Sequence, residues 1–176
     1  NFLLFHGLAE LFTVAVAVAV FVVAWNTRHF IDNSYFLFIG VAYLFVGILD
    51  ALHTFAYTGM GVFPQATANL PTQLWISSRL LESFSLLLGF YLMRFTLRIH
   101  WLFIGYLIVT AIILVSIFNG FFPVCYQPGQ GLTLFKVLAE YVVIFVLAAS
   151  SVILYRQRDQ FDTLIRIFLT GGIFST

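Results

Sequence analysis

The chain has 176 residues, of which 62% are hydrophobic, 19% aromatic and 9% charged, and its mean hydropathy is +1.04. Soluble domains are about half apolar and about one quarter charged, so this composition indicates an integral membrane protein surrounded by a lipid bilayer. The formal net charge of +1 leaves no basic patch for phosphates, which excludes a nucleic-acid partner, and the single cysteine excludes an intrachain disulfide.

Apolar runs of about twenty residues, the length that crosses a bilayer as a helix, follow one another along the chain. They predict an all-α, polytopic transmembrane helix bundle with five complete helices and the start of a sixth. Asn33-Ser34 suits the N-cap of the second helix, and Pro71-Thr72 marks the beginning of the third. The predicted helices are Phe2 to Trp25, Tyr35 to Phe55, Gln73 to Phe95, Trp101 to Phe118, and Thr133 to Tyr155, with the sixth from near Phe161.

The basic residues predict the orientation of this bundle, because cytoplasmic loops carry an excess of Lys and Arg. Arg28 follows the first predicted helix, Arg94 and Arg98 follow the third, and Arg156 and Arg158 follow the fifth. The connections after the second and fourth helices contain neither Lys nor Arg. We therefore expect the odd-numbered connections in the cytoplasm and the beginning of the chain outside.

Four pairs of ionisable residues fall inside the predicted helices, near the outer end of each. The members of a pair are three or four residues apart, so each pair shares one face of its helix. A charged group in a membrane segment is costly unless it is paired, hydrated or bound to a ligand, so these faces are expected to meet inside the bundle. The pairs are His6 with Glu10, Asp50 with His53, Arg79 with Glu82, and Lys136 with Glu140.

Each pair also has a simpler interpretation. The Arg79–Glu82 and Lys136–Glu140 pairs are equally consistent with ion pairs that neutralise each other within one helix. His6 is close enough to the start of the first helix to lie at the membrane interface, and Asp50–His53 is consistent with a buried pair without a ligand. The occurrence of all four pairs on one side of the membrane nevertheless favours a shared pocket.

The charge of this pocket predicts a cation. The pairs contain four carboxylates and two cationic side chains, which leaves two negative charges when the histidines are neutral. Either two carboxylates are protonated because burial raises their pKa, or a divalent ion supplies the balance. Imidazoles beside carboxylates suit zinc or a similar transition metal better than calcium or magnesium. The predicted metal ligands are His6, Asp50 and His53, with Glu10 or Glu82 as a fourth.

An organic ligand is the other interpretation of the same pocket. Trp75 lies one helical turn before Arg79, so an aromatic ring and a guanidinium together form a clamp for an anionic or planar group, or for a neighbouring carboxylate. Tyr57 follows His53 by four residues and is expected above it on the same helical stripe.

The order of these motifs resembles the third type of membrane-associated sensor domain, abbreviated MASE. The similarity extends over nearly the whole chain, and the second and third motifs are its most specific parts. The motifs are His6-x-x-x-Glu10-Leu-Phe, Leu49-Asp50-x-x-His53-Thr-x-x-Tyr57-x-Gly-Met60, Asn69-x-x-x-Gln73-x-Trp75-x-x-x-Arg79-x-x-Glu82, and Gly131-Leu-Thr133-x-Phe135-Lys136-x-x-x-Glu140-Tyr141.

The resemblance implies a role and an organisation. Residues 1–176 would be one integral membrane sensor domain, without catalytic residues, in a bacterial inner membrane. We expect it to be a homodimer and to be a fragment of a longer polypeptide, with a cytoplasmic histidine kinase or diguanylate cyclase as output domain after at least one further helix. The sensing pocket would face the periplasm and bind a small ligand or metal ion. The expected ligand-binding residues are Tyr57, Asn69, Trp75, Arg79, Lys136 and Glu140.

Two other functions remain open from the residues alone. A membrane zinc-dependent hydrolase would use His and carboxylate ligands around an ion that keeps an open position for water. A haem-binding electron carrier would use His6 and His53 as axial ligands, although the carboxylates beside them do not favour an apolar haem pocket.

Overall fold

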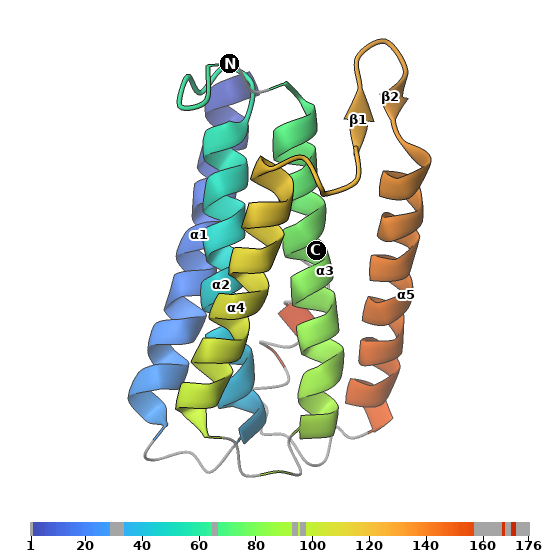
Figure 1. Ribbon diagram of the computed structural model, residues 1–176. Helices are drawn as coiled ribbons and strands as arrows, with labels where there is room; N and C mark the ends of the chain where they lie inside the picture. Colours follow the sequence, from blue (N-terminus) through green and yellow to red (C-terminus); the bar gives the residue numbers. More distant parts are fainter. Residues whose placement is uncertain are drawn as a thin grey trace.

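The computed structural model describes residues 2–28, 34–64, 67–92, 95, 98–156, 167 and 170–171. Within these residues the chain forms five helices and one short hairpin (Figure 1). The predicted all-α class is thereby confirmed, whereas Asn33 and most of the predicted sixth helix, from Phe161, lie outside the described residues. The elements are α1 Phe2–Thr27, α2 Ser34–Ala56, α3 Asn69–Leu92, α4 Ile99–Phe118, β1 Tyr126–Gln127, β2 Gly131–Leu132 and α5 Leu134–Arg156, with β1 and β2 antiparallel.

The third helix begins earlier than the sequence predicts. It starts at Asn69 rather than Gln73 and places Pro71 in its first turn, where a proline's missing N–H leaves no helical hydrogen bond unmade. This early start matters for function, because it brings the Asn69 side chain and the Pro71 carbonyl within reach of neighbouring segments.

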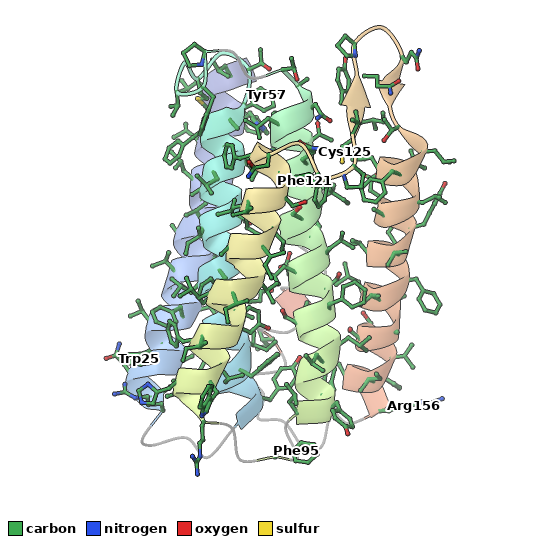
Figure 2. All side chains as sticks on the ribbon, viewed as in Figure 1. Trp25, Tyr57, Phe95, Phe121, Cys125 and Arg156 are labelled. Atoms are coloured by element: carbon green, nitrogen blue, oxygen red, sulfur yellow. The ribbon has the colours of Figure 1, made fainter. Side chains whose placement is uncertain are left out.

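The helices run alternately up and down the bundle, so the connections gather at its two ends (Figure 1). The α2–α3 connection and the β1–β2 hairpin lie at the end where α1 begins. Tyr57, Phe121 and Cys125 lie toward this end, and Trp25, Phe95 and Arg156 lie at the opposite end (Figure 2).

Four of the five helices in the described part of the chain are long and apolar enough to cross a membrane, namely α1, α2, α4 and α5. The sequence analysis predicted that the third helix would be a fifth span, but α3 is too polar to count by the same measure. Its polar residues face the protein instead of lipid: Ser77, Ser78, Arg79 and Glu82 are all buried. The buried hydroxyl of Ser77 donates to the carbonyl of Gln73 in its own helix, so its polar group is satisfied.

Helix α1 lies against α2 along a seam of small residues. A Cβ atom added at Gly40 would come within 2.3 Å of the Ala24 Cβ, and one added at Gly47 would come within 3.1 Å of the Ala17 Cβ. Ala17 and Ala24 are buried, whereas most large side chains of α1 are exposed and available for lipid contact. Small residues at a crossing let two membrane helices approach closely, as they do here.

Candidate functional site

A buried ionic network joins α2 to α3. Arg79 on α3 donates from Nη2 to Asp50 Oδ2 on α2 at 2.5 Å, and from Nη1 to Glu82 Oε2 at 2.6 Å. Glu82 Oε1 also accepts a hydrogen bond of 2.9 Å from the hydroxyl of Tyr43 on α2. Because Asp50, Arg79 and Glu82 are each at least 93% buried, this is a solvent-excluded cluster of two carboxylates and one guanidinium.

The network leaves polar atoms unused. Asp50 Oδ1 and Arg79 Nε are buried and have no hydrogen-bond partner within the part of the chain that the structure describes. Buried polar atoms without partners are rare in folded proteins, and each marks a place where a water or a ligand atom fits. One acceptor and one donor thus remain for such an atom at the centre of the bundle.

A cavity of about 330 Å³ lies between α3 and α5, beside this network. Arg79 lines it, so the buried guanidinium belongs to both the α2–α3 network and the cavity. Trp75 and Glu140 provide an aromatic face and a carboxylate, and Lys136 lies with its ammonium group 4.8 Å from the centre of the Trp75 ring while pairing with Glu140. The remaining lining residues are Ile76, Val137, Tyr141, Val143, Ile144 and Leu147.

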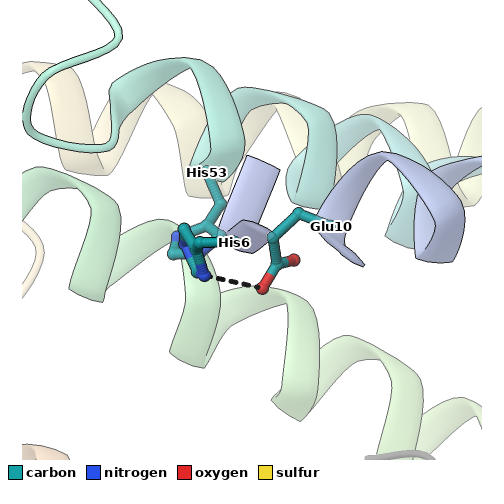
Figure 3. A group of neighbouring side chains, drawn as sticks. All are labelled: His6, Glu10 and His53. Atoms are coloured by element: carbon teal, nitrogen blue, oxygen red, sulfur yellow. Dashed lines mark ion pairs between the residues drawn. The ribbon is translucent and has the colours of Figure 1, made fainter. Parts of the chain in front are cut away.

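A second polar group joins α1 to α2, near the end where α1 begins. His6, Glu10 and His53 each place one ligand atom so that the three atoms lie within 4.8 Å of one another (Figure 3). His6 Nδ1 lies 3.9 Å from Glu10 Oε1 along the helix, and the rings of His6 and His53 meet edge to face with centres 6.1 Å apart. The ligand nitrogens of the two histidines therefore lie within 4.8 Å of each other, close to the separation of about 4 Å or less that two zinc-binding nitrogens have.

A backbone carbonyl orients His53. Its Nδ1 lies 2.8 Å from the Pro71 carbonyl oxygen in the first turn of α3. A carbonyl only accepts hydrogen bonds, so Nδ1 carries the proton and Nε2 of the neutral ring retains its lone pair. This is the usual arrangement of a metal-binding imidazole, whose other nitrogen donates to a carbonyl or carboxylate.

Tyr57 completes the surroundings of the two histidines. Its ring centre lies 4.2 Å from that of His6 and 6.4 Å from that of His53, so the aromatic ring covers the imidazoles. The position one turn beyond His53 agrees with the spacing in the sequence.

Asn69 anchors the connection between α4 and α5 and is not among the residues that line the cavity. Its Oδ1 accepts hydrogen bonds from the backbone N–H groups of Cys125 and Tyr126, at 2.8 and 2.9 Å. Gln73, one turn later, donates from Nε2 to the carbonyls of Phe122 and Pro123. Two amide side chains of α3 thus hold the segment that leads from α4 into the β1–β2 hairpin.

The five predicted metal ligands therefore divide into two groups. Asp50 and Glu82 lie against Arg79, outside the group of His6, Glu10 and His53, although the sequence analysis placed Asp50 among the direct metal ligands. Sequence reasoning missed Tyr43 and the Pro71 carbonyl. Tyr43 gave a signal in retrospect, since it lies seven residues before Asp50 and hence on the same face of α2.

Comparison with known proteins gives one result. The family model MASE3, described as a membrane-associated sensor domain, matches residues 1–176. The search of curated proteins and the search of solved structures found no match.

Proposed function

This chain belongs to the MASE3 family of membrane-associated sensor domains, and we propose on that basis that it is the signal-sensing input module of a larger membrane protein. Such a module binds a ligand without converting it. We propose further that the bound state is passed to a cytoplasmic output domain of the same polypeptide, a histidine kinase or a diguanylate cyclase.

The observation that carries the proposal is the cavity between α3 and α5. Its volume, about 330 Å³, is at the lower end of the roughly 300–1,000 Å³ typical of small-molecule sites. Apolar walls with a few converging polar groups are also typical of such sites, and here Trp75, Arg79 and Glu140 are those groups. We infer that a small ligand with a planar or charged group binds between the two helices.

The ion pairs around the cavity suggest how binding is transmitted. A ligand that approaches Trp75 competes with the Lys136 ammonium for the ring, and one that approaches Arg79 competes with Asp50. The first exchange changes how α5 lies against α3, and the second loosens α3 from α2. Helix α5 extends to Arg156, at the end of the bundle opposite the β1–β2 hairpin, and its displacement is the proposed signal.

The orientation and assembly of the module are part of the proposal. The excess of arginines after α1, α3 and α5 supports a cytoplasmic location for those ends. The cavity and the histidines would then face the periplasm of a bacterial inner membrane. We propose a homodimer, which brings two copies of the output domain together.

A cavity-filling substitution tests this function without knowledge of the natural ligand. Val137 lines the cavity, whereas its neighbour Leu138 on α5 is 54% exposed and is not among the lining residues. In the parent protein in native membranes, we expect Val137→Phe to change the basal activity of the output domain, because the added ring occupies the ligand's space. Leu138→Phe should leave that activity unchanged. Equal basal activities in both variants and the wild type would contradict the proposed cavity.

A further inference from the structure

We propose that His6, Glu10 and His53 bind one transition metal ion of the zinc class between α1 and α2. This site is separate from the cavity between α3 and α5, and it shares none of the residues that line that cavity. The proposal therefore goes beyond ligand sensing and stands independently of it.

The positions of the donor atoms support binding. Zinc bonds of about 2.0–2.2 Å in a tetrahedral site place neighbouring donors about 3.3–3.5 Å apart. The three donor atoms already lie within 4.8 Å of one another, so small side-chain rotations close the remaining distance. His6 and Glu10 keep 21% of their side-chain surface exposed, which leaves room for these rotations and a path for the ion.

The hydrogen bond from His53 to Pro71 supports the same conclusion. With Nδ1 donating to the carbonyl, the ring offers Nε2 as a ligand without any change of tautomer. The bond also fixes the ring plane. One of the three ligands is therefore already oriented before the ion arrives, which lowers the entropic cost of binding.

The local charge favours a divalent cation. Asp50 and Glu82 both pair with the guanidinium of Arg79, and Glu10 lies beside His6. Three carboxylates and one guanidinium leave two negative charges when all are ionised. The Lys136–Glu140 pair is neutral in sum and does not alter this balance. An ion with two positive charges compensates the excess at a depth where uncompensated charge is costly.

The donor types identify the class of metal. Two imidazoles and one carboxylate suit zinc and its neighbours among the divalent transition metals, whereas calcium and magnesium prefer shells of oxygen. A carboxylate beside the imidazoles also suits zinc better than a haem. Three protein ligands leave a fourth position for water.

Binding has a structural consequence for α1. The seam between α1 and α2 consists of small residues, and the ion adds a bond between the outer ends of the same two helices. Because His53 also contacts Pro71, the ion fixes α1, α2 and the first turn of α3 to one another.

The test uses the purified protein in detergent, with its affinity tag removed and its metals stripped by a chelator. Elemental analysis after incubation with Zn²⁺ gives the stoichiometry, and competition with a chromophoric chelator gives the affinity. We expect one Zn²⁺ per chain, and Co²⁺ in its place should show the visible absorption bands of a tetrahedral site.

Variants assign the ion to these residues. His6→Gln and Glu10→Gln should each weaken Zn²⁺ binding by more than the roughly 10- to 100-fold that loss of an outer hydrogen-bond partner costs. His100→Gln is the matched control, because His100 is exposed and lies in the first turn of α4, which begins at the opposite end of the bundle. His53→Gln tests the same site from α2, with circular dichroism as a check of folding.

Two outcomes would overturn the proposal. One is the absence of stoichiometric Zn²⁺ in the wild-type protein, and the other is unchanged affinity in folded His6→Gln and Glu10→Gln variants. The Val137→Phe variant should bind Zn²⁺ as tightly as the wild type, because Val137 lines the other site. This result would show that the metal site and the proposed ligand cavity are separate, so failure of one proposal leaves the other standing.

Discussion

The guanidinium of Arg79 on α3 donates to the carboxylate of Asp50 on α2 at 2.5 Å, with both side chains almost entirely buried. The two residues are 29 positions apart in sequence, and their ion pair connects two neighbouring helices of the bundle. Asp50 is also three residues from His53, so this bond lies between the cavity at Arg79 and the histidines of the proposed metal site.

Removal of Arg79 should strongly destabilise the protein. Arg79→Ala leaves Asp50 and Glu82 buried without their cationic partner, and loss of one member of a buried ion pair costs about 3–5 kcal/mol. Unfolding in a graded series of denaturing detergent measures the difference. Arg98→Ala, at an exposed position before α4, should leave stability unchanged. An Arg79→Ala protein as stable as the wild type would mean that the network carries no net stabilisation.

Asn69 should control the loop that carries Cys125. Asn69→Ala removes the acceptor for two backbone N–H groups, and a buried donor left without a partner costs about 1–3 kcal/mol. Hydrogen exchange of Cys125 and Tyr126 should accelerate. Asn69→Asp keeps an acceptor oxygen at this position and should preserve most of the protection. Equal exchange rates in wild type and Asn69→Ala would show that the hairpin is held by other contacts.

Alkylation of Cys125 should be slow and strongly dependent on pH. Burial raises the pKa of its thiol to about 11, an effect that the nearby Lys136 partly offsets. Only about one thiol in a thousand is then ionised at pH 8, and the thiolate is the reactive form. The rate of iodoacetamide labelling should still increase between pH 9 and pH 10 in the folded protein. In the unfolded chain the thiol of Cys125 ionises near its ordinary pKa of about 8.5, so labelling should already be fast there.

The raised pKa of the Cys125 thiol also determines how the stability of the protein changes with pH. A pKa raised in the folded state means that the neutral thiol is favoured there, so the stability that Cys125 contributes is complete below about pH 8.5. It is lost as the pH rises toward 11. Between about pH 8.5 and pH 11, the Cys125→Ser variant should therefore lose less stability than the wild type. A folded thiol that titrates at its ordinary pKa would contradict this expectation.

The seam between α1 and α2 should not tolerate an added methyl group. Gly40→Ala would place a Cβ 2.3 Å from that of Ala24, which forces the helices apart at a typical overpacking cost of about 1–3 kcal/mol. Gly105 on α4 has no atom within 4 Å of an added Cβ, so Gly105→Ala is the matched control. That control should be neutral or stabilising by up to about 1 kcal/mol, since alanine favours the helix.

Cysteine accessibility tests the orientation. Thr67 and Arg98 are exposed and precede α3 and α4, at opposite ends of the bundle. In a Cys125→Ser background, a membrane-impermeant maleimide added to intact cells should label Thr67→Cys and spare Arg98→Cys. The reverse pattern would place the histidines and the cavity on the cytoplasmic side.

The sequence predicted five helices and three of the four charged pairs within them. Arg79–Glu82 and Lys136–Glu140 follow from spacings of three and four, and both pairs form. The resemblance to the sensor-domain family is likewise confirmed over residues 1–176. These features depend on local periodicity and on motif order, which a single sequence contains.

Contacts between different helices could not be predicted from the sequence. The pairing of Asp50 with Arg79 depends on how α2 and α3 are rotated and offset, which apolar periodicity leaves undetermined when most of a helix is apolar. For the same reason nothing indicated that His53 would meet the Pro71 carbonyl, which required α3 to begin at Asn69. The hairpin of β1 and β2 lies in the connection after the fourth helix, where the sequence analysis predicted no strand.

The polarity of α3 has a consequence for how the protein enters the membrane during synthesis. An arginine at the centre of a lone helix opposes insertion by about 2.5–3.5 kcal/mol, and α3 carries a glutamate and several serines as well. Helix α2 emerges from the ribosome first, already long and apolar enough to insert, and it brings the carboxylate of Asp50 that receives Arg79. We therefore expect α2 and α3 to leave the translocon together, as a helical hairpin whose ion pair forms before either helix meets lipid on all sides.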